Sequence, residues 1–163
     1  MGIVIRKASP EDACDWADCR ISCLQSSYKG IYPDEIISKL PLEKEMHIEG
    51  YKTKLADPGD NEYYSVIHSG EMIGFLVTDT IKSEILAIYL LEDFWGKGYG
   101  KEIMDFAVNE LKRTKHEEII SLWVFEKNIR ARQFYERYGF SLHGAKKEIN
   151  RYDISLVQVK YVL

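Results

Sequence analysis

The sequence predicts an α/β (α+β) fold in which helices flank one mixed sheet. Strand-like apolar runs occur in seven places along the chain, and two amphipathic helical segments lie in its second half. Their order is a strand, several helices, a run of strands, and then helix, strand, helix and two strands. The 163 residues contain no internal repeat and no long linker, so we expect one domain over residues 1–163.

The first third of the chain combines one strand with helices. Residues 2–9 (GIVIRKAS) have the composition of a strand. In Ser9-Pro10-Glu11-Asp12, a serine stands at the N-cap, proline at the first helical position and acids in the first turn, which is typical of a helix start. This helix is expected to run to about Ser26. A short helix after Pro33 and another around 42–55 follow.

The middle of the chain predicts a hairpin, a further strand and a long helix. Residues 62–80 form two strands joined at Ser69-Gly70, a dipeptide that favours a tight turn. Residues 83–91 form the next strand. Over residues 99–114 the apolar side chains recur every fourth position and charged side chains take the other face, which indicates an amphipathic helix.

The last part of the chain adds three strands around one helix. Asn128 is a suitable N-cap for this helix, and Gly139 is a suitable residue to end it. The expected elements are a buried strand at 118–125, a helix over 128–140, and strands near 140–145 and 152–162.

Composition and charge argue against several classes of protein. The net charge of −4 and a pI near 5.6 disfavour nucleic acid as a partner. The longest apolar run, residues 85–91, is far shorter than the roughly 18 residues that a membrane span needs. The N-terminus has neither the apolar region nor the cleavage site of a signal peptide. We therefore expect a cytoplasmic protein that does not bind membranes.

The N-terminal helical region holds all three cysteines, which lie in its first helix, and a group of acids and aromatics. An odd number of cysteines without a signal peptide argues against a disulfide framework, and too few ligands surround Cys19 and Cys23 for a metal site, so no metal is expected. Three acids on this helix, Asp12, Asp15 and Asp18, are interpreted as a solvated face. Three aromatic residues, Trp16, Tyr28 and Tyr32, suit either a substrate pocket or the core.

The stretch DFWGKGYGK (93–101) places Gly96, Gly98 and Gly100 between a strand and a helix. Each glycine in a helix costs about 1 kcal/mol relative to alanine, so a cluster at a helix entry needs a reason. A helix N-terminus presents unpaired N–H groups and a partial positive charge, and glycines let an anion approach them. A Walker A loop is excluded because Glu102 stands where a Ser or Thr is required. By itself the loop is also compatible with a purely structural turn.

Two motifs together resemble the GNAT superfamily of acetyl-CoA-dependent N-acetyltransferases, in its small bacterial form. WGKGYGK (95–101) resembles the pyrophosphate motif, [Gln/Arg]-x-x-Gly-x-[Gly/Ala], of that family. NIRARQFYERYGF (128–140) resembles its Asn-x-x-Ala-x-x-x-Tyr-x-x-x-Gly-Phe segment. The resemblance implies the GNAT fold, with a single mixed and mostly antiparallel sheet of about seven strands. One departure stands at Trp95, where the family carries Gln or Arg.

The resemblance also implies which residues hold acetyl-CoA, the expected cosubstrate. The end of the central strand would pair with the pantetheine arm through Ile88, Tyr89 and Leu90. Asn128 would contact the cosubstrate near its pantetheine end, and Tyr135 would lie beside the sulfur. The loop amides that would hold the pyrophosphate are those of Gly96, Lys97, Gly98, Tyr99, Gly100 and Lys101.

The chemistry of acetyl transfer suggests catalytic residues. An alkylammonium must lose a proton before its nitrogen attacks the thioester, so a base or a chain of waters is needed. Glu84 stands sixteen residues before Gly100, where some members of the family carry a catalytic Glu. Glu92 and Asp93, at the strand end, are alternatives. Tyr135 is the candidate acid that protonates or stabilises the departing thiolate; one more core aromatic is the other interpretation of this residue.

The expected function is acetyl transfer to a primary amine in a direct ternary complex. The acidic balance and the likeness to small bacterial members favour a small cationic amine such as a polyamine; protein N-termini, lysines and aminoglycoside-like amines stay open. The alternative from another class is a CoA-binding regulatory module without catalysis. The edge strands expected near the C-terminus are compatible with a homodimer.

Overall fold

The computed structural model describes residues 2–114 and 119–163, and its strands form one sheet in the order β1-β2-β3-β4-β5-β7-β6. Neighbouring strands are antiparallel except β4 and β5, which run parallel. The predicted mixed, mostly antiparallel sheet of seven strands is therefore confirmed for the described residues. Its strands are β1 (Val4–Lys7), β2 (Asn61–His68), β3 (Glu71–Asp79), β4 (Glu84–Leu90), β5 (Ser121–Phe125), β6 (Ser141–Arg151) and β7 (Ile154–Val162).

The helices agree with the sequence expectations to within a few residues at each end. They are α1 (Ala13–Ser27), α2 (Asp34–Lys39), α3 (Lys44–Ala56), α4 (Tyr99–Thr114) and α5 (Ile129–Tyr138), with short 3-10 turns at Pro10–Asp12, Leu40–Glu43 and Glu92–Phe94. The largest difference concerns β6, which continues to Arg151 rather than ending near residue 145. Residue 118, the expected start of β5, lies outside the described residues.

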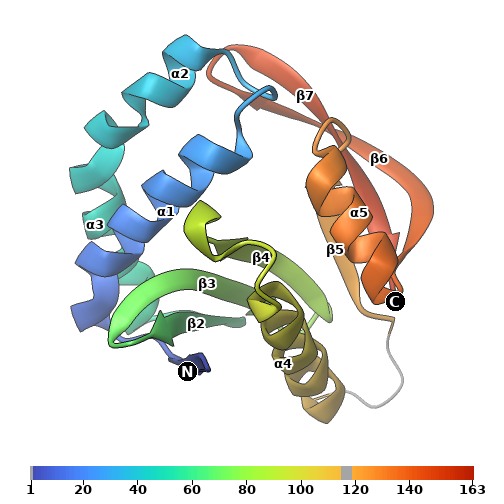
Figure 1. The fold of residues 1–163 in the computed structure, drawn as a ribbon, viewed down its shortest axis with the longest axis horizontal. Coiled ribbons are helices and arrows are strands. Elements are labelled where there is room, and N and C mark those ends of the chain that lie inside the picture. The colour runs from blue at the N-terminus through green and yellow to red at the C-terminus, as the bar shows by residue number, and fades with distance from the viewer. Residues whose placement is uncertain (1, 115–118) are drawn as a thin grey trace.

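Helices cover both faces of the sheet and separate its core into layers. The helices α1 and α3 lie on one face, while α4 and α5 lie on the other (Figure 1). On the α1 side, Trp16 is completely buried against Phe75 and donates a hydrogen bond from Nε1 to Ser65 Oγ at 2.8 Å. Trp16 is thus a core residue and does not line a pocket. A third cluster joins Tyr28 and Tyr32 to the β6–β7 end of the sheet.

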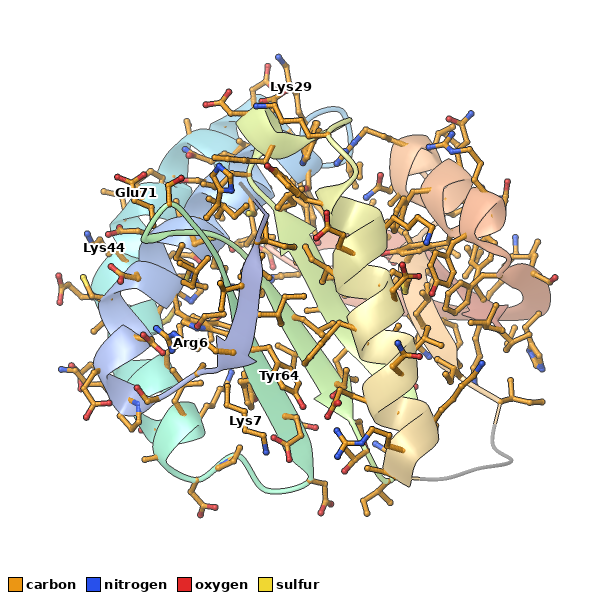
Figure 2. The ribbon with its side chains drawn as sticks, turned by 60° about the horizontal axis from the view of Figure 1, so that its bottom comes forward. Arg6, Lys7, Lys29, Lys44, Tyr64 and Glu71 are labelled. Atoms are coloured by element: carbon orange, nitrogen blue, oxygen red, sulfur yellow. The ribbon has the colours of Figure 1, made fainter. Side chains whose placement is uncertain are left out.

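Asp12 corrects one sequence interpretation, because it is not a solvated acid. Its side chain is only 12% exposed and its two carboxylate oxygens each accept a hydrogen bond from Arg6 at 2.7 Å. It also accepts a hydrogen bond from the Ser9 backbone N–H at 2.9 Å, which completes a capping box. Figure 2 shows Arg6 on β1 beside α1. This ion pair attaches the first strand to the start of the first helix, and it holds the pKa of Asp12 below its usual value.

The central strands β4 and β5 stay together for only two residue pairs. Their parallel register joins Glu84 to Ser121 and Ile85 to Leu122, and no further pair follows. Leu86 comes next; it has no partner on β3, because the register shifts there, and the residue is 43% exposed. Such a bulge bends a strand and increases its local twist. Beyond it, β5 belongs to a second part of the sheet with β6, β7 and α5, apart from β1 to β4 (Figure 1).

Gly74 sets the position of the far end of β4. It pairs with Leu90 in the register, and a Cβ built on Gly74 would collide with the backbone carbonyl of Tyr89. Any larger residue must therefore move β3 away from β4.

In the described residues, no helix is long and apolar enough to cross a membrane, and no cluster of three metal-ligating side chains occurs.

Replacing Gly74 by alanine should destabilise the fold by about 2 kcal/mol or more, because the clash involves backbone rather than a flexible side chain. Denaturant unfolding measures this loss. Gly50→Ala is the matched control: Gly50 lies in α3 with open space around its Cβ position, so the change should be neutral or stabilising by up to about 1 kcal/mol. Equal stability of the two variants would show that the close approach of β3 and β4 is not needed.

Candidate active site

A cleft of about 590 Å³ opens where β4 and β5 separate. Residues 85–90 of β4 form one wall and residues 122–125 of β5 form the other. The loop before α4, the face of α5, the end of α1 and the β6–β7 pair contribute the rest of the lining. Its volume is in the usual range for small-molecule sites.

The three residues predicted on the β4 wall all line the cleft. Ile88, Tyr89 and Leu90 lie beyond the bulge, where β5 no longer occupies their open edge. The backbone carbonyl of Leu90 accepts a hydrogen bond at 2.7 Å from Nε1 of Trp95. Trp95, the residue that departs from the family pattern, thereby connects the end of β4 to the start of the glycine loop.

The glycine loop has the geometry that an anion cradle needs. Gly96 and Gly98 have φ angles of 73° and 89°, which side-chain-bearing residues adopt only with strain. Gly96, Gly98, Gly100 and Lys101 line the cleft at the N-terminus of α4. The loop thus presents backbone without side chains at the positive end of a 16-residue helix.

The other two predicted loop residues turn their side chains elsewhere. The Lys97 ammonium lies over the Phe94 ring, 5.1 Å from its centroid. The Tyr99 ring packs against His68, with centroids 5.4 Å apart. Neither residue is part of the cleft lining, so only their backbone amides stay candidates for contact with a ligand.

Helix α5 brings both of its predicted residues to the cleft. Asn128 is the N-cap, and its Oδ1 accepts a hydrogen bond from the Ala131 N–H at 3.1 Å. Tyr135, two turns further on, is 8% exposed and also lines the cleft. Burial raises the pKa of Tyr135 to about 12, and the nearby charge of Arg130 opposes the rise. The phenol therefore stays protonated at neutral pH.

The three candidate bases lie outside the lining of the cleft. Glu84 is the first residue of β4 and pairs with Ser121, at the end where the two strands are still joined. Glu92 and Asp93 lie in the short turn after β4. None of the three is among the residues that line the cleft.

The cleft carries a positive charge that sequence inspection missed. Its lining contains one lysine and three arginines but, among the described residues, no Asp or Glu, which gives a formal charge of +4. Arg130 and Arg137 are seven residues apart on α5, a spacing that places them on one face of a helix and that could have been noticed. Arg151 is distant from every motif in the sequence. The four cations are Lys101, Arg130, Arg137 and Arg151.

Trp95 makes a second contact, with Arg130 of α5. Its guanidinium carbon lies 3.2 Å from the centroid of the Trp95 ring, a stacked cation–π arrangement. Burial lowers the pKa of Arg130, while Glu92 opposes the shift. Trp95 therefore joins β4, the glycine loop and α5 across the cleft.

Comparison with known proteins identifies the family. The model of the acetyltransferase (GNAT) family matches residues 24–140, well over half of the chain. The chain therefore belongs to this family, and the expected assignment as an acyltransferase enzyme is confirmed. A spermine/spermidine N(1)-acetyltransferase of Bacillus subtilis is 27% identical over 111 residues, which cover 60% of this chain and 73% of the relative. An N-acetyltransferase of Archaeoglobus fulgidus is 27% identical over 140 residues, covering 80% and 88%.

Solved structures show the same fold. The PaiA N-acetyltransferase of Thermoplasma acidophilum, in complex with coenzyme A, superposes with a TM-score of 0.74 at 24% identity over 98% of each chain. A GCN5-related N-acetyltransferase of Rhodopseudomonas palustris reaches a TM-score of 0.79 at 15% identity, covering 99% of this chain and 95% of the other. The predicted GNAT fold is confirmed.

Trp95→Phe should destabilise the protein by about 1 kcal/mol, because it removes the indole donor from the Leu90 carbonyl while keeping an aromatic ring beneath Arg130. Thermal or denaturant unfolding measures the change. Trp123→Phe is the control, since Trp123 also lines the cleft and contacts Lys147 with its ring, 4.2 Å from the Nζ. If both variants lose the same stability, the Trp95–Leu90 hydrogen bond contributes nothing measurable.

Proposed function

We propose that this enzyme transfers the acetyl group of acetyl-CoA directly to a primary amine within a ternary complex. The observation that supports this most is the single cleft that joins the glycine loop to Asn128 and Tyr135. These two motifs are separated by about thirty residues and by a whole helix in the sequence, yet both line the space between β4 and β5. A regulatory CoA-binding module would have no need for a buried, protonated phenol in that space.

The lining residues suit the parts of acetyl-CoA. The bare amides of Gly96, Gly98 and Gly100 and the cations around them would hold the pyrophosphate and the 3′-phosphate, since both are strongly anionic. Among the β4 residues, Leu90 already has its carbonyl engaged by Trp95. The Tyr89 carbonyl faces Gly74 on β3, so we expect Ile88 to provide most of the backbone contacts with the pantetheine arm, with Asn128 near its end.

The proposed reaction needs two proton movements. An ammonium with a pKa of about 10.4 must first lose a proton to a base or to water. The nitrogen lone pair then attacks the thioester carbonyl carbon, the C–S bond breaks, and an amide and a thiolate result. Of the two protons that leave the nitrogen, one ends on the sulfur and the other in solvent.

Tyr135 is proposed to stabilise the departing sulfur. A thiol has a pKa of about 8.5, so a phenol whose pKa is raised to about 12 would not lose its proton completely to a thiolate. It donates a strong hydrogen bond to the developing negative charge instead. Burial of Tyr135 is thus compatible with a role in charge stabilisation during C–S cleavage.

The base is a separate part of the proposal. Glu84 is retained as the candidate, and its place at the joined end of β4 and β5 would require the proton to travel through water. Glu92 and Asp93 are the alternatives closer to the strand end that lines the cleft.

A polyamine is one candidate acceptor, because a curated relative is named for spermine and spermidine. Protein N-termini and lysines are further candidates. A cytoplasmic location, the single domain over residues 1–163 and a homodimer belong to the same proposal. The mostly exposed edge strand β6 supports the last of these.

The first test combines binding and turnover. Acetyl-CoA at 100 times its Kd should stabilise the protein by about 2.7 kcal/mol, which a thermal-shift assay detects. Tyr135→Phe should then keep this shift but release free thiol about 10- to 100-fold more slowly with an amine acceptor. Tyr138→Phe is the control, because that hydroxyl donates to Asp105 at 2.8 Å and does not line the cleft. No thermal shift at millimolar acetyl-CoA would refute the proposed function; unchanged turnover would refute the role of Tyr135.

The second test concerns the base. If Glu84 removes the proton, Glu84→Gln should change the pH–rate profile of the enzyme and lower the rate at neutral pH at least about tenfold. Glu92→Gln, measured in parallel over the same pH range, should retain the wild-type profile. A Glu84→Gln profile identical to wild type would exclude Glu84.

A further inference from the structure

One region of the cleft wall lies apart from the residues that are proposed to hold acetyl-CoA. It lies where the segment after α1 meets the β6–β7 pair, and it is formed by Tyr28, Tyr32 and Arg151. The two segments come together at the same end of the molecule (Figure 1). The Tyr32 and Tyr152 rings meet edge to face there, with centroids 5.8 Å apart.

Tyr32 has a buried hydroxyl that lacks a hydrogen-bond partner. Its side chain lines the cleft, the residue is only 3% exposed, and its hydroxyl contacts no donor or acceptor in the described part of the chain. Three rings hold it in place, since Tyr28, Phe125 and Tyr152 lie 4.8, 5.9 and 5.8 Å from it. Burial raises the pKa of Tyr32, so this hydroxyl is a protonated donor at neutral pH. Buried polar groups of this kind normally have a partner, and this hydroxyl stands without one in a residue of the cleft wall.

Arg151 provides a second donor group in the same region. It lines the cleft, and its guanidinium carbon lies 4.8 Å from the centre of the Tyr152 ring. Within residues 2–114 and 119–163, no carboxylate forms an ion pair with it. A guanidinium with its charge unpaired beside an unsatisfied hydroxyl matches the oxygens of a carboxylate or phosphate.

Glu43 lies near this region but outside the cleft lining. Its two carboxylate oxygens accept the Tyr152 hydroxyl at 2.9 and 3.0 Å, and one of them lies 3.2 Å from His47. The half-buried Arg20 is near the phenol groups of Tyr28, Tyr51 and Tyr89 but is not part of the cleft lining. At this end of the lining, a second ammonium of a substrate would meet Arg151 and no acid of the described residues, whereas an anion would meet complementary charge.

We propose that the acceptor is an amine that also carries an oxyanion, a carboxylate or a phosphate, which Arg151 and the Tyr32 hydroxyl bind. This inference rests on the proposed acetyl transfer and narrows its acceptor. It disfavours a polyamine, because the second ammonium of a polyamine finds no carboxylate in the cleft lining of the described residues.

Matched pairs of amines test the proposal. Phenylalanine against phenethylamine examines a carboxylate, phosphoethanolamine against ethanolamine examines a phosphate, and spermidine represents the polyamines. With acetyl-CoA saturating, free-thiol release should give at least a tenfold higher kcat/KM for the acidic member of one pair. The pair that shows this preference identifies the oxyanion as a carboxylate or a phosphate. In Arg151→Gln this preference should fall to near unity, mainly through KM. Tyr32→Phe should reduce it in the same direction by a smaller factor.

Arg137→Gln is the matched control. Arg137 lines the cleft on α5, so its loss is expected to weaken acetyl-CoA binding while leaving the ratio within each pair unchanged. A wild-type preference for spermidine or for the plain amines would overturn the oxyanion proposal. So would an acidic preference that survives in Arg151→Gln.

A binding readout separates failure of this inference from failure of the proposed function. Thermal shift is measured with phenylalanine and with phosphoethanolamine, for the protein alone and for the protein saturated with CoA. A shift for wild type that Arg151→Gln abolishes supports the oxyanion site even if no thiol is released. If neither compound shifts the melting temperature or reacts, the oxyanion proposal is refuted, whatever acetyl-CoA itself does.

Discussion

The parallel pairing of β4 and β5 over only two residue pairs is the constraint on which the rest of this molecule depends. A longer ladder would close the cleft, and no ladder would separate the two parts of the sheet. The bulge at Leu86 ends the pairing, and Gly74 keeps the continuing part of β4 tight against β3. Beyond the bulge, β4 is therefore paired with β3 along one edge and unpaired along the other. This leaves its backbone groups available for a ligand.

Trp95 shows how a departure from a family motif can still serve the site. In place of a Gln or Arg, the indole donates to the Leu90 carbonyl and supports the guanidinium of Arg130 from below. These contacts connect β4, the glycine loop and α5, the three elements around the proposed cosubstrate. The loop can then keep its positive-φ glycines without relying on the side chains of Lys97 or Tyr99, which pack elsewhere.

Local patterns in the sequence predicted most of the elements, since caps, turns and hydrophobic periods act over a few residues. The Asn128 cap and the glycine loop belong to this class. Features that depend on tertiary contacts were not predictable in the same way. Asp12 was expected to be solvated, although its partner Arg6 stands on the preceding strand. Gly74 and Arg151 carry no local signal, because their roles come from strands that meet only in the folded sheet.

The charge of the cleft differs from the charge of the chain, and this difference bears on the acceptor. A net charge of −4 favoured a cationic acceptor at first, but the cleft lining of the described residues carries four cations and no acid. Screening limits charge interactions at the surface to about 8–10 Å at physiological salt. A ligand in the cleft therefore interacts mainly with the charges of the lining and much less with the net charge of the chain. In the proposed complex, phosphates of acetyl-CoA would account for the cations near the glycine loop and α5. Arg151 is far from those elements in the sequence and lies beside Tyr32 and Tyr152, and the proposed oxyanion on the acceptor would give it a function.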